Sequence, residues 1–445
     1  MFDGYVSLAA VGLATALAIL FWPSKAAALL LLFAPIIWAF GSADINSKEA
    51  TGPPNVAMAV SGAATLMYAP LLLLRYRNPE FKWLQTASIA YCVAILPSVF
   101  VSASSVESFK GYLRLVSPVI FMFGLLRGSR PRGVNALHFK AIAFSSLCLF
   151  ATVLLAQYSG EGWYALGGFD RLRAFNLSAL AIAEYSVAVV SVLVCGVLMG
   201  KRHLVYGTAI VGLVVCTYLT GFRTAWIGMA VLVGLVMVIA VRSGLAKFVA
   251  LLIALGMVGA SGIIIQSLAR YAHDDEQVSI DNVTSGRITT DSIALSRYLA
   301  GTPAEWIFGI GVHSSRDATL EEEGTAFDVH SDFLAHLIEC GVVGALAYVL
   351  LLTTIGSSLF RRMRYLPQGH AARTFAAVGF ASFVAVTIMG IPGAMYNNVF
   401  VGWYYYGFLG FVLAQIPNRR ASYQHAEGTV FQASMAGSLE PAARH

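Results

Sequence analysis

Thirteen stretches of consecutive apolar residues divide this 445-residue chain, and each is long enough, or nearly so, to cross a bilayer as a helix. A helix that crosses the hydrocarbon core needs about 17 to 25 residues. The stretches are continuously apolar rather than alternating, which excludes transmembrane β-strands. Because the second, fifth and eighth are short, the sequence predicts twelve or thirteen spans. They lie at about 5–22, 24–40, 56–74, 86–104, 112–126, 137–157, 177–199, 204–220, 224–241, 246–268, 333–360, 373–391 and 397–415.

The composition agrees with a chain that lies mostly in lipid. Hydrophobic residues make up 58% of the chain and charged residues 12%, and the mean hydropathy is +0.72. A soluble domain carries roughly 25% charged residues. The five cysteines lie in or beside apolar stretches without metal-ligand spacing and are interpreted as small helix residues. The sequence therefore predicts an all-α fold, a polytopic integral membrane helix bundle with one large loop.

The predicted spans divide the chain into four parts. Residues 1–268 hold the first ten spans with short loops, and 269–332 form one long polar loop. Residues 333–416 hold the last three spans. Residues 417–445 are polar and rich in alanine, glycine and serine, which predicts a disordered tail.

Charged residues alternate between two sets of loops. Cytoplasmic loops of membrane proteins are enriched in lysine and arginine. The basic set is therefore predicted to face the cytoplasm, together with the C-terminus, and the long loop to face the other side. The basic set holds Lys25, Arg75, Arg77, Lys82, Arg127, Arg130, Arg132, Lys140, Lys201, Arg202, Arg242, Lys247, Arg361, Arg362, Arg364, Arg373, Arg419 and Arg420, with Glu80 as its acidic residue. The other set holds Asp44, Glu49, Glu107, Glu161, Asp170 and the 269–332 loop.

Arginines in the second set of loops run against this charge bias and need another explanation. Arg171 and Arg173 precede a span, Arg223 lies in a tight turn between two spans, and Arg287 lies in the long loop. An arginine beside hydrocarbon is costly to leave unpaired. Several together suit a phosphate or diphosphate, through forked, charge-assisted hydrogen bonds. The alternatives are an interfacial anchor for the first pair and a solvated loop residue for Arg287.

His330 stands directly before the span predicted to begin at residue 333. The unpaired N–H groups and the dipole of a helix N-terminus disfavour a charged imidazolium. A neutral imidazole can accept a proton, as a general base must. Asp332 has a side chain suited to capping the helix, and His336 is expected to be a buried polar residue. The spacing of the histidines and acids does not predict a metal site.

Five segments resemble those of the bacterial O-antigen ligases and O-antigen polymerases. Their order around one large loop carries the resemblance, which covers about residues 170–350. Ser331 stands where asparagine is commoner in the family, and Phe222 stands where serine is commoner. The segments are Arg171 to Asn176 (Arg…Phe-x-Asn), Phe222 to Trp226 (Ser-Arg-Gly/Thr-x-Trp), Ser285 to Arg287 (Ser-Gly-Arg), Trp306 to Gly311 (a turn with two glycines), and Val329 to Leu334 with Glu339 to Gly344 (His-Asn-x-x-Leu…Glu-x-Gly-x-x-Gly).

Proteins of this family transfer a glycan from an undecaprenyl diphosphate carrier to a sugar hydroxyl of an acceptor. They act at the periplasmic face of the bacterial inner membrane without nucleotide, metal or other cofactor. The resemblance implies direct attack with inversion at the anomeric carbon and a carrier tail that runs between helices in the bilayer. It assigns His330 as the general base, Arg223, Arg287, Arg173 and Arg171 as diphosphate-binding residues, and Asp332, Asn176 and Ser331 as supporting residues.

Several alternatives remain open at the level of sequence. A ligase uses a lipid A core sugar as acceptor, which the compact single loop favours, whereas an O-antigen or exopolysaccharide polymerase extends a carrier-linked glycan. A relative that glycosylates protein is a further variant. A transporter of lipid-linked glycans would use the same arginines for binding alone. A non-catalytic scaffold is a further alternative. Charges inside the spans are scarce, with Glu184 the main exception, which favours a site on one face. The net charge of +6 is spread over short loops and predicts no nucleic-acid partner.

Overall fold

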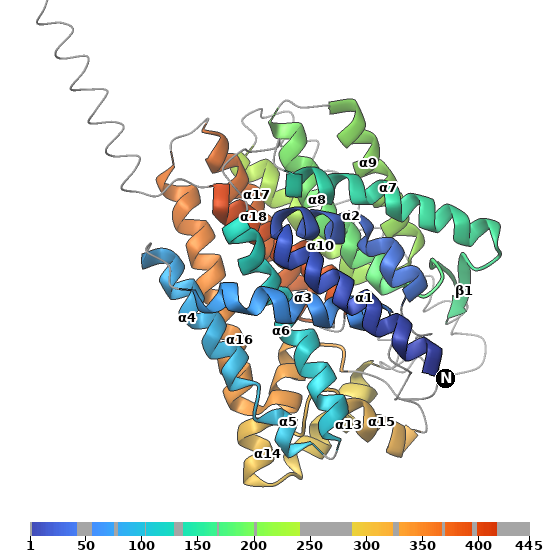
Figure 1. Ribbon diagram of the computed structural model, residues 1–445, viewed down its shortest axis with the longest axis vertical. Helices are drawn as coiled ribbons and strands as arrows, with labels where there is room; N and C mark the ends of the chain where they lie inside the picture. Colours follow the sequence, from blue (N-terminus) through green and yellow to red (C-terminus); the bar gives the residue numbers. More distant parts are fainter. Residues whose placement is uncertain are drawn as a thin grey trace, which may run out of the picture.

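A computed structural model of the protein describes eleven segments of the chain (Figure 1). They are residues 2–41, 56–74, 79–102, 104–128, 137–166, 169–199, 203–240, 287–323, 329–366, 370–393 and 398–415. Long helices pack side by side into a bundle, and one short antiparallel hairpin connects two of them. The elements are α1 (Phe2–Phe21), α2 (Pro23–Gly41), α3 (Val56–Leu73), α4 (Pro79–Ala94), α5 (Ser98–Val101), α6 (Ser105–Gly128), α7 (Leu137–Tyr158), β1 (Trp163–Leu166), β2 (Phe169–Leu172), α8 (Ala179–Leu198), α9 (His203–Leu219), α10 (Arg223–Ala240), α13 (Arg287–Leu299), α14 (Pro303–Phe308), α15 (Ser314–Glu323), α16 (Asp332–Tyr365), α17 (Ala371–Met389) and α18 (Val399–Gln415).

The described helices confirm a multi-pass, all-α membrane protein. Within the described segments, nine stretches of helix are long and apolar enough to span a membrane, and three shorter apolar helices accompany them. The fourth predicted span corresponds to α4 and α5, which are joined by a turn that ends at Pro97. The predicted span at 246–268 and the tail at 417–445 lie outside the described residues. The choice between twelve and thirteen spans therefore stays a prediction.

Helix α6 is central to the bundle, where it packs against α18 and α3. A side chain at Gly410 of α18 would overlap the backbone of Met122 in α6, so the two helices approach closely there. Small residues commonly allow such an approach between membrane helices. The indole of Trp403 stacks on Phe121 at 4.8 Å and donates a 2.9 Å hydrogen bond to the Ser117 hydroxyl. This contact fixes α18 against α6 in both rotation and height.

Polar contacts join segments that the sequence analysis assigns to the same set of loops. Loops of the basic set meet one another: Arg127 donates to the carbonyl of Leu74, and Arg362 donates to that of Leu413 at 2.9 Å. Loops of the other set also meet, since Arg287 donates to the carbonyl of Pro392 at 2.7 Å. The candidate site lies among the loops of this second set.

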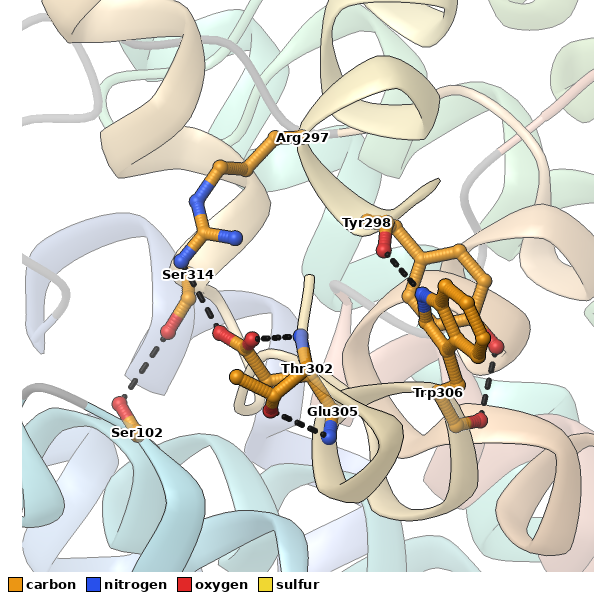
Figure 2. Close-up of polar contacts among 7 residues, drawn as sticks. All are labelled: Ser102, Arg297, Tyr298, Thr302, Glu305, Trp306 and Ser314. Atoms are coloured by element: carbon orange, nitrogen blue, oxygen red, sulfur yellow. Dashed lines mark hydrogen bonds and ion pairs between the residues drawn. The ribbon is translucent and has the colours of Figure 1, made fainter. Parts of the chain in front are cut away.

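The described part of the long loop folds into α13, α14 and α15, which lie together at one end of the bundle, at the bottom of Figure 1. Sequence analysis predicted only a polar loop here. Helix α14 begins with a capping box, in which Thr302 and Glu305 each bind the other's backbone N–H, and Pro303 occupies the first turn. The Tyr298 hydroxyl donates to the Trp306 carbonyl at 2.8 Å and the Trp306 indole donates to the Tyr298 carbonyl at 3.1 Å (Figure 2). These bonds join α13 to α14.

Helix α16 is interrupted at Gly341, whose φ of 68° and ψ of −175° are not helical. The break leaves carbonyl groups of the preceding turn without helical partners. The turn after α14 supplies those partners, because Ile310 donates to the carbonyl of Ile338 at 3.0 Å and Gly311 donates to that of Glu339 at 3.1 Å. The long loop is thereby attached to the segment of α16 that follows His330.

Candidate functional site

Two arginines from distant parts of the chain lie over the ring of Phe222, and a third, Arg223, is its neighbour in the sequence. The guanidinium carbon of Arg171 lies 5.8 Å from the centroid of this ring, and that of Arg287 lies 5.7 Å from it. Arg171 also interacts electrostatically with Arg223 and Arg287. We call Arg171, Arg223 and Arg287 the arginine cluster. Like charges brought together in this way favour an anionic ligand, which relieves their repulsion.

Local structure explains how the arginine cluster forms. Arg171 lies in β2, opposite Tyr164 of β1, and the hairpin places it beside the turn that joins α9 to α10. That turn contains Gly221, whose φ of 67° favours glycine. Trp226, in the first turn of α10, donates from its indole to the carbonyl of Thr217 in α9 at 3.1 Å. This bond clamps the turn and positions Arg223 at the start of α10.

Arg287 is the first residue of α13, and its side chain is partly buried. Burial lowers the pKa of Arg287, the nearby carboxylate of Asp291 raises it, and the positive charges of Arg171 and Arg223 lower it. An arginine nevertheless stays charged at any ordinary pH. The Arg287 guanidinium is thus a partly desolvated positive charge, and an anion that replaced the lost water would stabilise it.

A buried carboxyl group lies behind the arginine cluster. Glu184 of α8 is only 1% exposed, and it accepts a 2.7 Å hydrogen bond from the side-chain amide of Asn398. It interacts electrostatically with Arg287 and with Asp332. Sequence analysis noted Glu184 only as an exceptional charge within a span. Its neighbours show that this carboxyl group lies at the same end of the bundle as the arginines.

His330 is held by Asp291, a residue that sequence analysis did not identify. The backbone N–H of His330 donates to Asp291 Oδ1 at 2.9 Å, and His330 Nδ1 lies 3.8 Å from the same oxygen. This Nδ1 is buried and makes no hydrogen bond within the described residues. A separation of 3.8 Å exceeds a hydrogen bond, although such contacts often shorten when substrate binds. The carboxylate of Asp291 therefore faces the Nδ1 side of the His330 ring.

The helix that follows His330 is anchored at its first residues. The Ser331 side chain caps α16 by accepting from the N–H of Leu334 at 3.4 Å. Ser331 is therefore the N-cap of α16, whereas sequence analysis considered Asp332 for this role. The backbone N–H of Asp332 instead donates to the carbonyls of Gly390 and Gly393, at 2.8 and 3.2 Å. The turn between α17 and α18 thereby binds the start of α16.

His336 is a buried polar residue, as predicted. Its ring stacks on Tyr348 at 3.9 Å, and its Nε2 lies 3.0 Å from the Tyr91 hydroxyl. Its Nδ1 lies 2.6 Å from the carbonyl oxygen of Asp332. These contacts account for both ring nitrogens and give His336 a structural role within α16.

Arg173 and Asn176, two other residues assigned by resemblance, have contacts of a different kind. The Arg173 Nε donates to the carbonyl of Glu161 at 3.3 Å, and its Nη2 lies 3.9 Å from the Glu161 carboxylate. The backbone N–H of Asn176 donates to the carbonyl of Ala39 in α2 at 3.3 Å. Arg173 thus braces the hairpin that presents Arg171, and the segment at Asn176 ties the hairpin to α2.

The site is built from arginines and one histidine with its carboxylate. Within the described segments, no group of three or more histidine, cysteine, aspartate or glutamate side chains could hold a metal ion. All five cysteines are free thiols, in agreement with their interpretation as helix residues. Neither comparison with models of known protein families nor comparison with curated proteins finds a match to this sequence. The functional argument therefore rests on the geometry of the site.

Proposed function

We propose that the protein is a membrane glycosyltransferase of the O-antigen ligase and polymerase type, which moves a glycan from a lipid diphosphate to a sugar hydroxyl. One observation carries the proposal: α13 joins the arginine cluster to His330. Arg287, its first residue, belongs to the arginine cluster, and Asp291, one turn later, binds His330. The anion-binding Arg287 and the carboxylate that holds the proton acceptor His330 thus lie on one short helix.

The arginine cluster has the chemistry to bind the diphosphate of the donor. Forked guanidinium groups donate two parallel hydrogen bonds to phosphate oxygens and also neutralise their charge. During transfer, the bond between the anomeric carbon and the diphosphate oxygen breaks, and its electron pair leaves with the diphosphate. Positive groups already in place at that oxygen stabilise the developing charge without reorganisation. Arg287 and Arg223 are assigned this role, with Arg171 as the third contact.

His330 completes the reaction as a general base. The acceptor hydroxyl attacks the anomeric carbon from the side opposite the leaving diphosphate, with inversion, and its proton moves to Nε2 of His330. The Asp291 carboxylate orients the ring and stabilises the imidazolium that forms, in the way that a carboxylate supports histidine in other proton-transfer sites. The proton then passes from His330 to water or to the released diphosphate.

The proposed setting is the periplasmic face of a bacterial inner membrane, with an undecaprenyl chain between the helices. Ligase and polymerase differ only in the acceptor, a lipid A core sugar or a carrier-linked glycan. The described part of the long loop is a compact unit of three short helices attached to α16, which supports the ligase as the first alternative. Neither variant requires a metal ion or nucleotide in this mechanism.

Transfer by purified protein tests the proposal directly. Wild type, His330→Ala and Arg287→Ala are incubated in detergent and EDTA with undecaprenyl-diphosphate-linked glycan and either lipid A core or more carrier-linked glycan. Arg361→Ala, an exposed arginine at the opposite end of the bundle, is the matched control. Glycan transferred to lipid A core by wild type and the control alone supports a ligase, and longer carrier-linked chains support a polymerase. Lipid-linked glycan that crosses vesicle membranes, without transfer and unaffected by His330→Ala, would support a transporter instead.

A further inference from the structure

A second basic group lies where α6 meets the turn before α15. Arg114 is the tenth residue of α6, about 14 Å along the helix from its start. An ionisable residue this far inside a spanning helix commonly marks a binding site. Its Nη1 lies 3.2 Å from Nε2 of His313. Because arginine can only donate hydrogen bonds, the His313 imidazole is the acceptor.

The backbone of His313 is held in an unfavourable conformation. Its φ is 66°, and among the described residues only one other non-glycine residue has a positive φ. Such strain persists where surrounding contacts enforce it, and it is frequent at binding sites. Here the Ser108 hydroxyl of α6 donates to the carbonyl of Val312 at 3.0 Å, and the hydroxyls of Ser314 and Ser102 are 3.1 Å apart (Figure 2). Both sides of the turn are therefore fixed so that the ring of His313 faces α6.

Arg316 lies three residues after His313, in the first turn of α15. Its backbone N–H donates to the carbonyl of His313 at 3.2 Å, and its Nε is buried without a hydrogen-bond partner in the described residues. Helix α15 begins at the same turn, at Ser314. Lys110, one turn before Arg114 on α6, is paired with Glu107 at 2.6 Å and so contributes less net charge.

We propose that Arg114, His313 and Arg316 form a second anion site, which binds the phosphate of a second lipid, the acceptor of the transfer reaction. The identification of this lipid as the acceptor rests on the proposed function, whereas anion binding itself does not. Helix α16 contacts both sites: Asp332 binds the turn that also accepts from Arg287, and Glu339 accepts from Ser315 of α15. Two phosphate-bearing lipids would thus lie on either side of the helix that begins after His330.

The competing explanation is structural, since Arg114 and His313 could simply tie the long loop to α6. A count of bound lipids distinguishes the two. Native mass spectrometry of the purified protein with undecaprenyl diphosphate, free of glycan, is expected to show two lipids on wild type and on the control Arg361→Gln. Arg114→Gln, Arg316→Gln and Arg287→Gln are each expected to retain one lipid. The Arg287→Gln/Arg316→Gln double variant is expected to retain none.

Further ligands identify the lipid group that is bound, and a further variant controls for a loss of stability. Phosphatidic acid should compete at the second site, and undecaprenol, which lacks phosphate, should bind at neither. Arg316 contacts His313 through its backbone N–H, which Arg316→Gln keeps. This variant therefore tests the site even where Arg114→Gln lowers the melting temperature. One lipid on wild type, or two on Arg316→Gln, would overturn the second site. Two bound lipids without glycan transfer would contradict the enzyme proposal and leave the second site standing.

Kinetics give an independent readout for an active protein. Loss of a charge-assisted hydrogen bond to phosphate in Arg316→Gln is expected to raise the KM for the acceptor about tenfold or more. The KM for the donor should stay at the wild-type value. An equal rise in the KM of donor and acceptor would show that Arg316 stabilises the folded protein rather than binding the acceptor.

Discussion

The backbones of Gly309 and Gly341 are in close contact where the turn after α14 crosses the break in α16. A side chain on Gly309 would overlap the carbonyl of Glu339, and one on Gly341 would overlap the carbonyl of Ile307. Both glycines have positive φ, 85° and 68°, with ψ near 180°, a region that other residues rarely occupy. The crossing therefore excludes any side chain at either position, and it connects the long loop to the helix that follows His330.

Gly341→Ala is accordingly expected to destabilise the protein and to reduce transfer. The backbone conformation alone costs an alanine about 1–3 kcal/mol, and the overlap with Ile307 adds to that cost. The melting temperature of the purified variant in detergent measures the effect. Gly234→Ala in α10 is the matched control, because a side chain there would meet no atom within 4 Å. Equal melting temperatures for the two variants would show that the crossing is absent in the folded protein.

Asp291→Asn should separate binding from proton transfer. The amide keeps the size of the side chain and can still accept from the His330 N–H, but it cannot stabilise an imidazolium. Because general bases contribute about 10²- to 10⁴-fold, we expect kcat to fall about tenfold to a hundredfold. Affinity for undecaprenyl diphosphate should not fall, because the variant removes a negative charge near Arg287. A loss of affinity with unchanged kcat would place Asp291 in the anion site and remove its proposed role at His330.

Arg171 and Arg173 provide a comparison between two arginines of one hairpin. Arg171→Gln removes a member of the arginine cluster, so the Kd for undecaprenyl diphosphate should rise about tenfold or more. Arg173 is directed to Glu161, so Arg173→Gln should change this Kd much less and act mainly through the stability of the hairpin. Isothermal titration of both variants measures the difference. A larger rise in Kd for Arg173→Gln would restore the role that resemblance assigned to it.

Several features of the fold and site could be predicted because they depend on local composition. Continuous apolar runs identified the described spans, and arginines on the unexpected face identified Arg171, Arg223 and Arg287. The helices of the long loop could not be predicted from hydropathy, since they bury only a small cluster around Ala294 and Tyr298. The charge bias that drew attention to arginines also could not separate Arg171 from Arg173, because the hairpin register decides which one meets Phe222.

Other features depend on contacts between distant segments. Asp291 lies in a mixed polar stretch, and only the folding of α13 brings it to His330. Arg114 lies within a predicted span, and no residue near His313 in the sequence distinguishes that histidine. Their contact could not be predicted, because only the fold brings them together. Gly341 stands in a long apolar run, where a glycine is ordinary. The break in α16 could not be predicted there, because it depends on hydrogen bonds from the turn after α14.

Glu305 predicts how the stability of the long loop depends on pH. Its hydrogen bond from the Thr302 backbone N–H lowers the pKa of this carboxyl, desolvation partly opposes the shift, and Arg297, 3.0 Å away, lowers it further. A carboxyl whose pKa is lower in the folded state stabilises that state above the ordinary value of about 4.3. This stability is lost as the pH falls through the lower, folded value. The contribution of Glu305 to the stability of the loop should be roughly 1 kcal/mol at pH 7, as for a cap with a partly exposed ion pair. It should begin to decline as the pH approaches 4.

Glu305→Gln tests this dependence, because the amide preserves the shape of the cap without its charge. At pH 7 the variant should exchange the amides of α14 faster than wild type, and the difference should shrink as the pH falls through and below 4. Hydrogen exchange measured by mass spectrometry resolves this six-residue helix from the spanning helices. Arg297→Gln is the matched comparison and should reproduce only the smaller part of the effect, since the first cause of the shift is the backbone bond. A difference between Glu305→Gln and wild type that stayed constant with pH would show that the charge of Glu305 does not stabilise α14.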